Sequence, residues 1–185
     1  GCFGKWHLGD QPEFLPTNQG FDTYYGIPYS NDMWPGLKRW QFPELPILRD
    51  EKVVGIVKDM KAQGQLCKQF TEEAVKFIRE KKDEPFFVYL PHAFVHHPRS
   101  ASDSFLEKAG LDETFNSDPA STTHNHELRA RTKATIEEVD WSAGQILDTI
   151  RELGIAENTY VIFTSDNGGA SGCVNKPLKG GKGSQ

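Results

Sequence analysis

The spacing of apolar positions changes along the chain and predicts where helices and strands lie. Over residues 55–82 apolar side chains recur three and four positions apart, which is typical of an amphipathic helix that Pro85 then ends. A second, longer helix is expected over 127–153, with Gly154 as its C-terminal cap. Residues 1–50 are rich in glycine, proline and aromatic residues, show little periodicity, and are expected to form loops and short turns.

Two short apolar runs predict strands. Residues 86–90 (Phe-Phe-Val-Tyr-Leu) follow the first helix and lead into a polar loop over 92–125, and residues 160–164 (Tyr-Val-Ile-Phe-Thr) follow the second helix. Such runs are typical of strands buried on both faces of a sheet. The alternation of strands and helices predicts a parallel α/β sheet, in which ligands bind at the carboxyl ends of the strands. Polar residues directly after these strands are therefore candidates for function.

Composition narrows the possible classes of protein. The chain has 185 residues, of which 37% are hydrophobic, and this fits one soluble domain. A net charge of -5 argues against a nucleic-acid binder and against a basic membrane-binding face. No uncharged apolar stretch of about 18 residues predicts a transmembrane span. The cysteines Cys2, Cys67 and Cys173 lack the spacing of a zinc site and form at most one disulfide.

The first candidate site is the segment 4–9 (Gly-Lys-Trp-His-Leu-Gly). In an extended segment Lys5 and His7 project to the same side, and the flanking glycines allow a ligand to approach the backbone. Lysine neutralises an anion, and histidine donates a hydrogen bond or moves a proton. An exposed basic turn is the alternative interpretation, since short motifs produce many false positives.

A second candidate comes after the first predicted strand, where His92, His96 and His97 lie within six residues. A histidine at the end of a strand can act as an acid, a base or a hydrogen-bond donor to an anion. A zinc site would need a third and a fourth ligand that the neighbouring sequence does not supply. A structural hydrogen bond in a loop explains any one of these histidines equally well.

Two further segments lie near the C-terminal end. Asp166 and Asn167 offer adjacent oxygen ligands directly after the second predicted strand, a donor set that favours calcium or magnesium over zinc or copper. A plain Asn-Gly turn is the alternative. Residues 178–184 (Leu-Lys-Gly-Gly-Lys-Gly-Ser) form a glycine-rich loop that can cradle an oxyanion but lacks P-loop spacing. Taken alone, it also fits a surface loop.

In this order, the segments resemble the sulfatase family of the alkaline-phosphatase-like superfamily, and in particular its arylsulfatase A-like members. Residues 4–9 look like the second sulfatase signature, and residues 18–32 look like the segment that comes after it. Residues 86–98 resemble the strand and histidine loop, 166–168 the metal-ligand motif, and 178–183 the lysine loop. The resemblance implies an α/β fold with a mixed, mostly parallel sheet sandwiched by helices.

The resemblance also assigns roles to individual residues. Lys5 and His7 match the pair that contacts the nucleophile and the sulfate. His96 matches the histidine that contacts the sulfate ester and its leaving group; it is preferred to His92 because the family's histidine lies two residues before a proline. Lys182, in preference to Lys179, matches the lysine that binds the sulfate and the leaving oxygen.

Two more pairs of residues are assigned in the same way. Asp166 and Asn167 match ligands of a divalent cation, calcium in preference to magnesium. Asn31 and Asp32 are expected to face the substrate pocket. The family's nucleophile is a formylglycine made from cysteine in a Cys-x-Pro-Ser-Arg motif, and that motif is absent here, as is the aspartate pair that completes the metal site.

These matches and absences lead to one leading function and two alternatives. The chain does not begin with methionine, and we expect residues 1–185 to be the central part of a single sulfatase catalytic domain, truncated at both ends and inactive alone. The whole protein is expected to be a sulfuric ester hydrolase whose missing N-terminal part supplies the formylglycine. A phosphate or phosphonate monoester hydrolase of the same superfamily and a non-catalytic anion-binding relative are the alternatives.

The expected substrate is a sulfated small molecule or a sulfated glycan. The resemblance implies a periplasmic, secreted or lysosomal protein. Neither a nucleic-acid partner nor a membrane span is expected, and the oligomeric state is left open.

Overall fold

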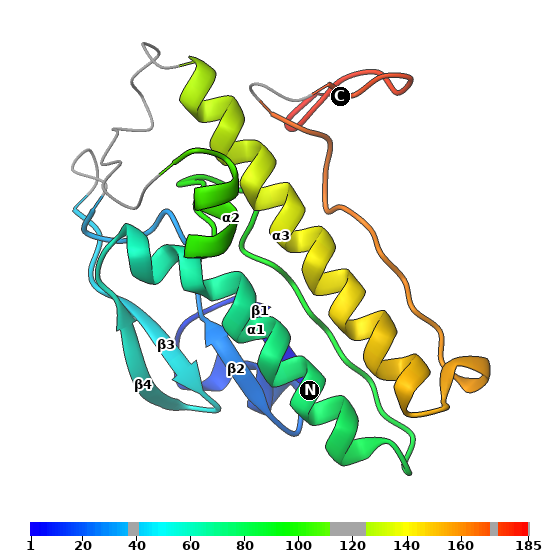
Figure 1. Cartoon of the computed structure of the whole chain (residues 1–185). Coiled ribbons are helices and arrows are strands. Elements are labelled where there is room, and N and C mark those ends of the chain that lie inside the picture. The colour runs from blue at the N-terminus through cyan, green and yellow to red at the C-terminus, as the bar shows by residue number, and fades with distance from the viewer. Residues whose placement is uncertain (37–40, 112–124, 171–173, 185) are drawn as a thin grey trace.

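The computed structural model describes residues 1–36, 41–111, 125–170 and 174–184 (Figure 1). A mixed sheet and α-helices make up its regular structure, so the predicted α/β class is confirmed. The strands are β1 (Cys2–Lys5), β2 (Tyr24–Ile27), β3 (Leu45–Arg49) and β4 (Lys52–Val57). The α-helices are α1 (Met60–Lys81), α2 (Asp103–Lys108) and α3 (Asn125–Glu152), and short 3-10 helices are also present.

The sheet combines parallel and antiparallel pairs in the order β1-β2-β3-β4. Strands β1 and β2 are parallel, whereas β2 with β3 and β3 with β4 are antiparallel. Residues 87–91 extend the sheet beyond β1. The amide of Phe3 donates to the carbonyl of Tyr89 at 2.9 Å, and that of Lys5 donates to the carbonyl of Pro91 at 2.8 Å. Three extended segments therefore run in the same direction and end at one edge of the sheet.

Two glycines allow these parallel segments to approach closely. A Cβ on Gly26 would lie 1.8 Å from the carbonyl oxygen of Gly4, and a Cβ on Gly4 would lie 2.1 Å from the carbonyl oxygen of Pro91. Gly4 also has a φ of 146°, which disfavours any other residue. The backbones of β1, β2 and 87–91 can meet in this way only without side chains at these positions.

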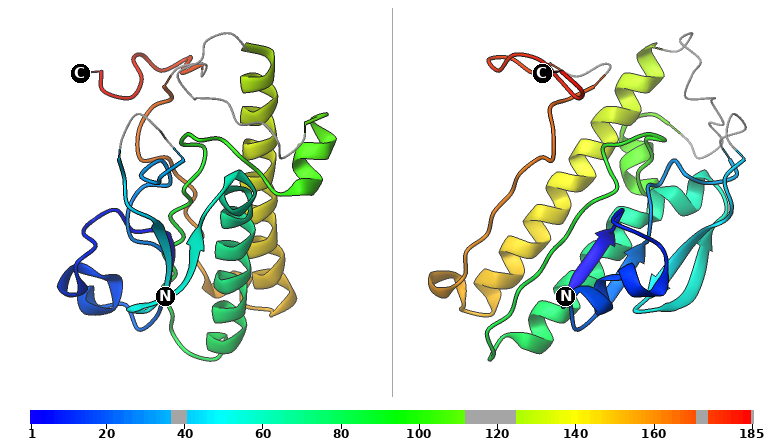
Figure 2. Two further views of the ribbon diagram at one scale, coloured as in Figure 1. Left: turned by 90° about the vertical axis from the view of Figure 1, so that its left-hand side faces the viewer. Right: turned by 180° about the vertical axis from the view of Figure 1, so that it is seen from behind.

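Both long helices lie on the same side of the sheet, where α1 packs on the strands and α3 packs on α1 (Figure 2). The core between the sheet and α1 is made by Ile27, Leu45, Ile47, Val57, Leu66 and Phe70. On the opposite face, Cys2 and Tyr24 pack with Trp6 and Leu15. Among the described residues, that face is covered by the segment after β1, which contains the 3-10 helices η1 (Pro12–Phe14) and η2 (Pro16–Gln19).

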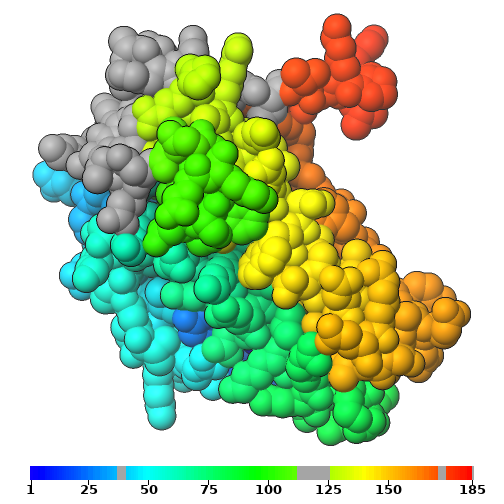
Figure 3. Space-filling view, in the orientation of Figure 1, coloured from blue at the N-terminus to red at the C-terminus, as the bar shows by residue number. Residues whose placement is uncertain are grey.

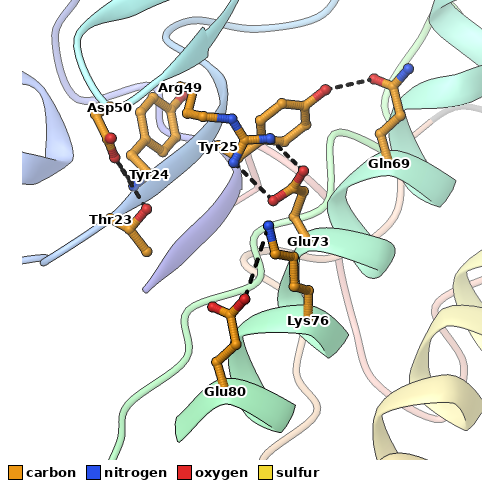
Figure 4. A network of polar contacts seen from close by, with 9 residues as sticks. All are labelled: Thr23, Tyr24, Tyr25, Arg49, Asp50, Gln69, Glu73, Lys76 and Glu80. Atoms are coloured by element: carbon orange, nitrogen blue, oxygen red, sulfur yellow. Dashed lines mark hydrogen bonds and ion pairs between the residues drawn. The ribbon is translucent and has the colours of Figure 1, made fainter.

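A polar network also fastens α1 to the sheet (Figure 4). The guanidinium of Arg49 on β3 donates two hydrogen bonds to the carboxylate of Glu73 on α1. The same guanidinium lies 4.7 Å from the ring centroid of Tyr25, whose hydroxyl donates to Gln69 on α1. At its other end α1 begins where the carboxylate of Asp59 accepts a hydrogen bond from the amide of Ala62 at 2.8 Å.

Two predictions made from periodicity are wrong in their boundaries or type. Residues 52–57 form β4, so the first helix begins at Met60 and not near residue 55. The valines and isoleucine in this stretch favour a strand, and Asp59 caps the helix only afterwards. Residues 1–50 were expected to form loops and short turns but contain β1, β2 and β3. These strands were missed because four or five residues are too few to show a periodic pattern. The second helix and the cap at Gly154, with φ 70°, are confirmed.

The two predicted apolar strands have different outcomes. Residues 87–91 do run beside β1, but only one of their faces is covered, and Phe87 and Tyr89 on the other face are 68% and 43% exposed. Residues 160–164 belong to no strand, and their apolar side chains face solvent. Instead, this segment returns along α3 (Figure 1), so the expected burial of 160–164 is wrong here because no described strand offers it a hydrogen-bonding partner.

Cys2 and Cys67 are buried free thiols, and Cys173 lies outside the described residues. Among the described helices, none combines the length and the apolar character needed to cross a bilayer.

The glycine contacts lead to a test with a matched pair of variants. We expect Gly26→Ala to lower the free energy of unfolding by about 1–3 kcal/mol or more, because the new methyl group has no space beside Gly4. Gly144→Ala, inside α3 with no atom within 4 Å of its Cβ position, should instead stabilise the protein by about 0.5–1 kcal/mol. Denaturant unfolding of the full-length protein measures both. Equal effects of the two variants would contradict the close approach.

Candidate functional site

The carboxyl ends of the three parallel segments carry most of the candidate residues. Strand β1 ends at Lys5 and continues to His7, whose amide donates to the carbonyl of Pro28 at 3.0 Å. Asn31 and Asp32 come after β2, and His96 comes after the segment 87–91. Because the carboxyl ends of parallel strands lie at one edge of a sheet, the backbone itself gathers these residues there.

Lys5 is at the electrostatic centre of this edge. Its side chain is partly buried, and this burial lowers the pKa of its ammonium group. The positive charge of Lys182 lowers the pKa further, whereas the negative charges of Asp166 and Asp32 raise it. Charged residues from three other segments of the sequence therefore act on one ammonium group. The structure brings the charges of Lys5, Asp32, Asp166 and Lys182 close together, and the roles that the resemblance assigns to them stay predictions.

His7 belongs to the same cluster and lies at the surface. Partial desolvation lowers the pKa of its imidazole, Lys5 and Lys182 lower it further, and Asp32 opposes them. The ring is therefore neutral at neutral pH. The backbone at His7 has a φ of 57°, a left-handed conformation that turns the chain directly after β1.

Asp32, His96 and His97 make a compact polar group beside Lys5. The carboxylate oxygens of Asp32 lie 4.0 Å from Nδ1 of His96 and 3.5 Å from Nε2 of His97. The two imidazole rings are stacked, with centroids 4.5 Å apart. Nδ1 of His96 also lies 2.8 Å from the carbonyl oxygen of His97. Because a carbonyl only accepts, Nδ1 carries the proton, and Nε2 of the neutral ring keeps a free lone pair.

His92 and His96, the two candidates for the active-site histidine, lie in different surroundings. Its Nε2 is hydrogen-bonded to the hydroxyl of Ser142 on α3 at 3.0 Å, and that hydroxyl is bonded to Thr71 on α1 at 2.6 Å. Burial lowers the pKa of His92 to about 4. His92 therefore joins the loop to both helices as a neutral side chain, whereas His96 is affected by the charges of Asp32 and Lys5.

Asn31 differs from its neighbour Asp32. Its side chain is completely buried, and neither its Oδ1 nor its Nδ2 has a hydrogen-bond partner among the described residues. Its backbone carbonyl accepts a hydrogen bond from Nε2 of Gln63 on α1 at 2.6 Å. The side chain of Asn31 does not reach the surface, whereas that of Asp32 does, and the expectation that both face the substrate pocket stays a prediction.

Asp166 and Asn167 lie at the end of the exposed segment after α3, next to the lysine loop. The amide of Lys182 donates to the carbonyl of Gly169 at 3.4 Å, and Asn175 exchanges two hydrogen bonds with the backbone of Gly169. Among the described residues, none donates a hydrogen bond to the side-chain oxygens of Asp166 or Asn167. Two free hard oxygen donors of this kind fit a calcium ion, which takes six to eight oxygens in all.

The arrangement places two lysines beside Asp32 and Asp166 at one edge of a protein that is acidic overall. Two lysines and two histidines surround the end of β1, although the net charge of the chain is -5. Local potential and not net charge decides which ligand binds. The site therefore fits a small oxyanion, with neutral imidazoles available for hydrogen bonding and proton transfer.

Comparison with known proteins agrees with this geometry. The family model described as Sulfatase matches residues 1–185, which is the whole chain. The chain belongs to the sulfatase family. The order of its candidate residues in the sequence, which first suggested the resemblance, is thus accounted for by common descent.

Particular sulfatases show how much of the family this chain represents. It is 33% identical to mouse N-acetylgalactosamine-6-sulfatase, over 96% of this chain and 32% of that protein. Human arylsulfatase A is 31% identical over 91% of this chain and 32% of that protein. The crystal structure of Ps i-CgsB in complex with a neocarrahexaose superposes with a TM-score of 0.70 and 28% identity, over 99% of this chain and 41% of that chain. The chain spans about a third of the length of the curated sulfatases that it matches.

The structure also adds a residue to which the sequence assigned no role. His97 was one of three clustered histidines, and only the structure shows that its Nε2 faces Asp32. The sequence carried no signal for this, because Asp32 and His97 lie 65 positions apart and meet only when β2 pairs with β1.

The low pKa of His92 predicts how stability depends on pH. The folded protein holds His92 neutral down to about pH 4, while in the unfolded chain the imidazole is protonated below about pH 6.5. The contribution of neutral His92 to the free energy of unfolding is therefore complete above about pH 6.5. It is lost as the pH falls, and the loss amounts to about 3 kcal/mol near pH 4. We expect His92→Asn to flatten this decline in denaturant unfolding of the full-length protein.

The matched control is His126→Asn, because His126 is exposed on α3. It should keep the wild-type pH dependence. A His92→Asn protein that loses stability with falling pH as steeply as the wild type would contradict the buried neutral state of His92.

Proposed function

We propose that the protein containing this chain hydrolyses sulfate monoesters, and that Lys5, His7, His96 and Lys182 bind the sulfate group. The observation that carries the proposal is the convergence of charge on Lys5, whose ammonium is influenced by both Lys182 and Asp166. Membership of the sulfatase family supports it.

The two lysines have an electrostatic role in this proposal. A sulfate monoester is an anion, and attack on its sulfur atom requires charge neutralisation around the oxygens. Lys5 is held at the end of a strand and partly buried, so its position is fixed before a ligand arrives. Lys182 approaches from the glycine-rich loop, and a developing negative charge on the leaving oxygen would be stabilised there.

The histidines hold and move protons. Burial lowers the pKa of His96, so the ring is neutral at neutral pH, with Nδ1–H held by the carbonyl of His97 and Nε2 free. In this state Nε2 accepts a proton or a hydrogen bond from a ligand hydroxyl. His7 is likewise neutral and presents its ring beside Lys5.

A calcium ion and a nucleophile, neither of which is among the described residues, complete the proposed site. Asp166 and Asn167 would hold a calcium ion, which supplies positive charge and orients the sulfate oxygens when bound. The nucleophile would be a formylglycine from a part of the protein beyond these 185 residues, as the family resemblance implies.

The proposed substrate class is a sulfated glycan, with a small sulfate ester as the alternative. Two related proteins support this class, namely N-acetylgalactosamine-6-sulfatase by its name and Ps i-CgsB by its complex with a carrageenan-type oligosaccharide. A periplasmic, secreted or lysosomal location, implied by the resemblance, stays a prediction.

The first test measures hydrolysis of 4-nitrophenyl sulfate and of a sulfated oligosaccharide by the full-length protein. We expect turnover of sulfate esters in preference to the matching phosphate esters. Replacing Lys182 by Ala should lower kcat/KM by about 10²–10³-fold, because one preorganised positive charge is removed.

Lys179→Ala is the matched control for that experiment. Lys179 lies in the same loop, but Lys182 and not Lys179 is a main cause of the lowered pKa of Lys5 and of His7. We expect the Lys179 variant to keep nearly the wild-type rate. Equal losses in both variants, or preferential turnover of phosphate esters, would argue against the proposed site.

The second test concerns calcium. Asp166→Asn removes one negative ligand, so calorimetry of the full-length protein should show weaker calcium binding, and half-maximal activity should require more calcium. Asp83→Asn, at an exposed position after α1, is the control and should leave both quantities unchanged. Unaltered calcium affinity in the Asp166 variant would remove Asp166 from the metal site.

A further inference from the structure

The cluster of Asp32, His96 and His97 has the donor set of a second kind of metal site. One carboxylate oxygen of Asp32 and one ring nitrogen of each histidine all lie within 4.8 Å of one another. Within the described ranges this is the one group of three or more such side chains that meets this distance. We propose that these three residues bind a divalent transition metal of the zinc type, and that the bound metal blocks His96.

The chemistry of the donors distinguishes this site from the oxygen ligands Asp166 and Asn167. Imidazole nitrogens are borderline ligands that suit zinc, copper and nickel, whereas carboxylate and amide oxygens alone suit calcium and magnesium. Two histidines and one carboxylate are also a donor set found in zinc enzymes, where a water or substrate occupies the fourth position. A calcium ion at the oxygen ligands therefore does not satisfy the histidines.

The geometry requires only small movements. Zinc–ligand bonds of about 2.0–2.2 Å in a tetrahedron place ligand atoms about 3.4 Å apart. Asp32 Oδ2 and His97 Nε2 are already 3.5 Å apart, and Asp32 Oδ1 and His96 Nδ1 are 4.0 Å apart. The imidazoles turn about χ2, a torsion with broad energy minima, so closing the remaining gap is inexpensive.

A hydrogen bond beside the cluster favours the same role. Nδ1–H of His96 is held by the carbonyl of His97 at 2.8 Å, which fixes one tautomer of the ring. Metal-binding histidines commonly donate their second ring N–H to a carbonyl in this way. Nδ1, the atom that lies 4.0 Å from Asp32, binds the metal only when this hydrogen bond breaks and the proton moves to Nε2; otherwise Nε2 is the ligand.

Access and charge set the expected affinity. The side chains of Asp32 and His96 are about a quarter exposed, and that of His97 is half exposed, so an ion can enter from solvent. Lys5 lies close enough to lower the pKa of His96, and the same positive charge opposes a second cation. We therefore expect micromolar and not tighter binding of zinc.

Inhibition results from the position of His96 and rests on the proposed function. A metal bound to His96 removes the free imidazole from the sulfate site, so zinc should inhibit hydrolysis in competition with the ester. Metal binding itself does not depend on the reaction, and this allows the two ideas to be tested apart.

The experiment uses the full-length protein, freed of metal by chelation and then supplied with excess calcium. Zinc is titrated by calorimetry, and cobalt by its visible absorption, which is strong only in tetrahedral sites. His97→Ala should weaken zinc binding at this site by about tenfold or more, since even outer ligand partners contribute that much. The zinc concentration for half-inhibition, measured against the zinc-free rate of each variant, should rise by the same factor.

His126→Ala is the control, because His126 is exposed on α3 and apart from the cluster. It should bind zinc as the wild type does. Should His97→Ala fail to fold, Asp32→Asn tests the same site, because it keeps the shape of the side chain and removes its charge. Weaker zinc binding in that variant is then the expected result.

Two results would overturn the proposal. One is equal zinc affinity in the wild type and in the folded variants. The other is inhibition that excess calcium relieves and that His97→Ala does not alter, which would place zinc at Asp166 and Asn167. Loss of zinc binding in His97→Ala, in a protein that hydrolyses no sulfate ester, would support the metal site and refute the proposed function.

Discussion

The close approach of three parallel backbones, β1, β2 and residues 87–91, is the constraint on which the site depends. Gly4 and Gly26 have no side chains, and the hydrogen bonds of Lys5 and Phe3 to residues 89–91 hold the third segment in place. The loops after these segments therefore all emerge at one edge of the sheet. The site is gathered by backbone geometry, and the side chains then act on one another through charge.

The sequence predicted residue types and their order better than it predicted local structure. Lys5, His7, Asp32, His96, Asp166 and Lys182 were all identified in advance as site candidates, and the structure brings their charges together. The strands before residue 50 were missed because they are short and contain glycine and proline. The contact between Asp32 and His97 depends on strand pairing, and no spacing rule in the sequence reveals such a contact.

Separate layers of the molecule have separate tasks. The helices α1 and α3 are joined to the histidine loop through Thr71, Ser142 and His92, a buried chain of hydroxyl groups and one imidazole. Closer to the edge of the site, the loop instead presents the imidazoles of His96 and His97 to Asp32. In the space-filling view the lysine loop near the C-terminal end projects from this body (Figure 3).

The exposed segment 160–164 has a consequence for handling these 185 residues in isolation. Tyr160, Ile162 and Phe163 are 100%, 86% and 74% exposed, and residues 159–164 contain no charge, glycine or proline. Six residues of this composition have the signature of a steric zipper. Glu157 and Asp166 flank them and act as gatekeepers against self-association. A concentrated solution of these residues alone is thus prone to form fibrils.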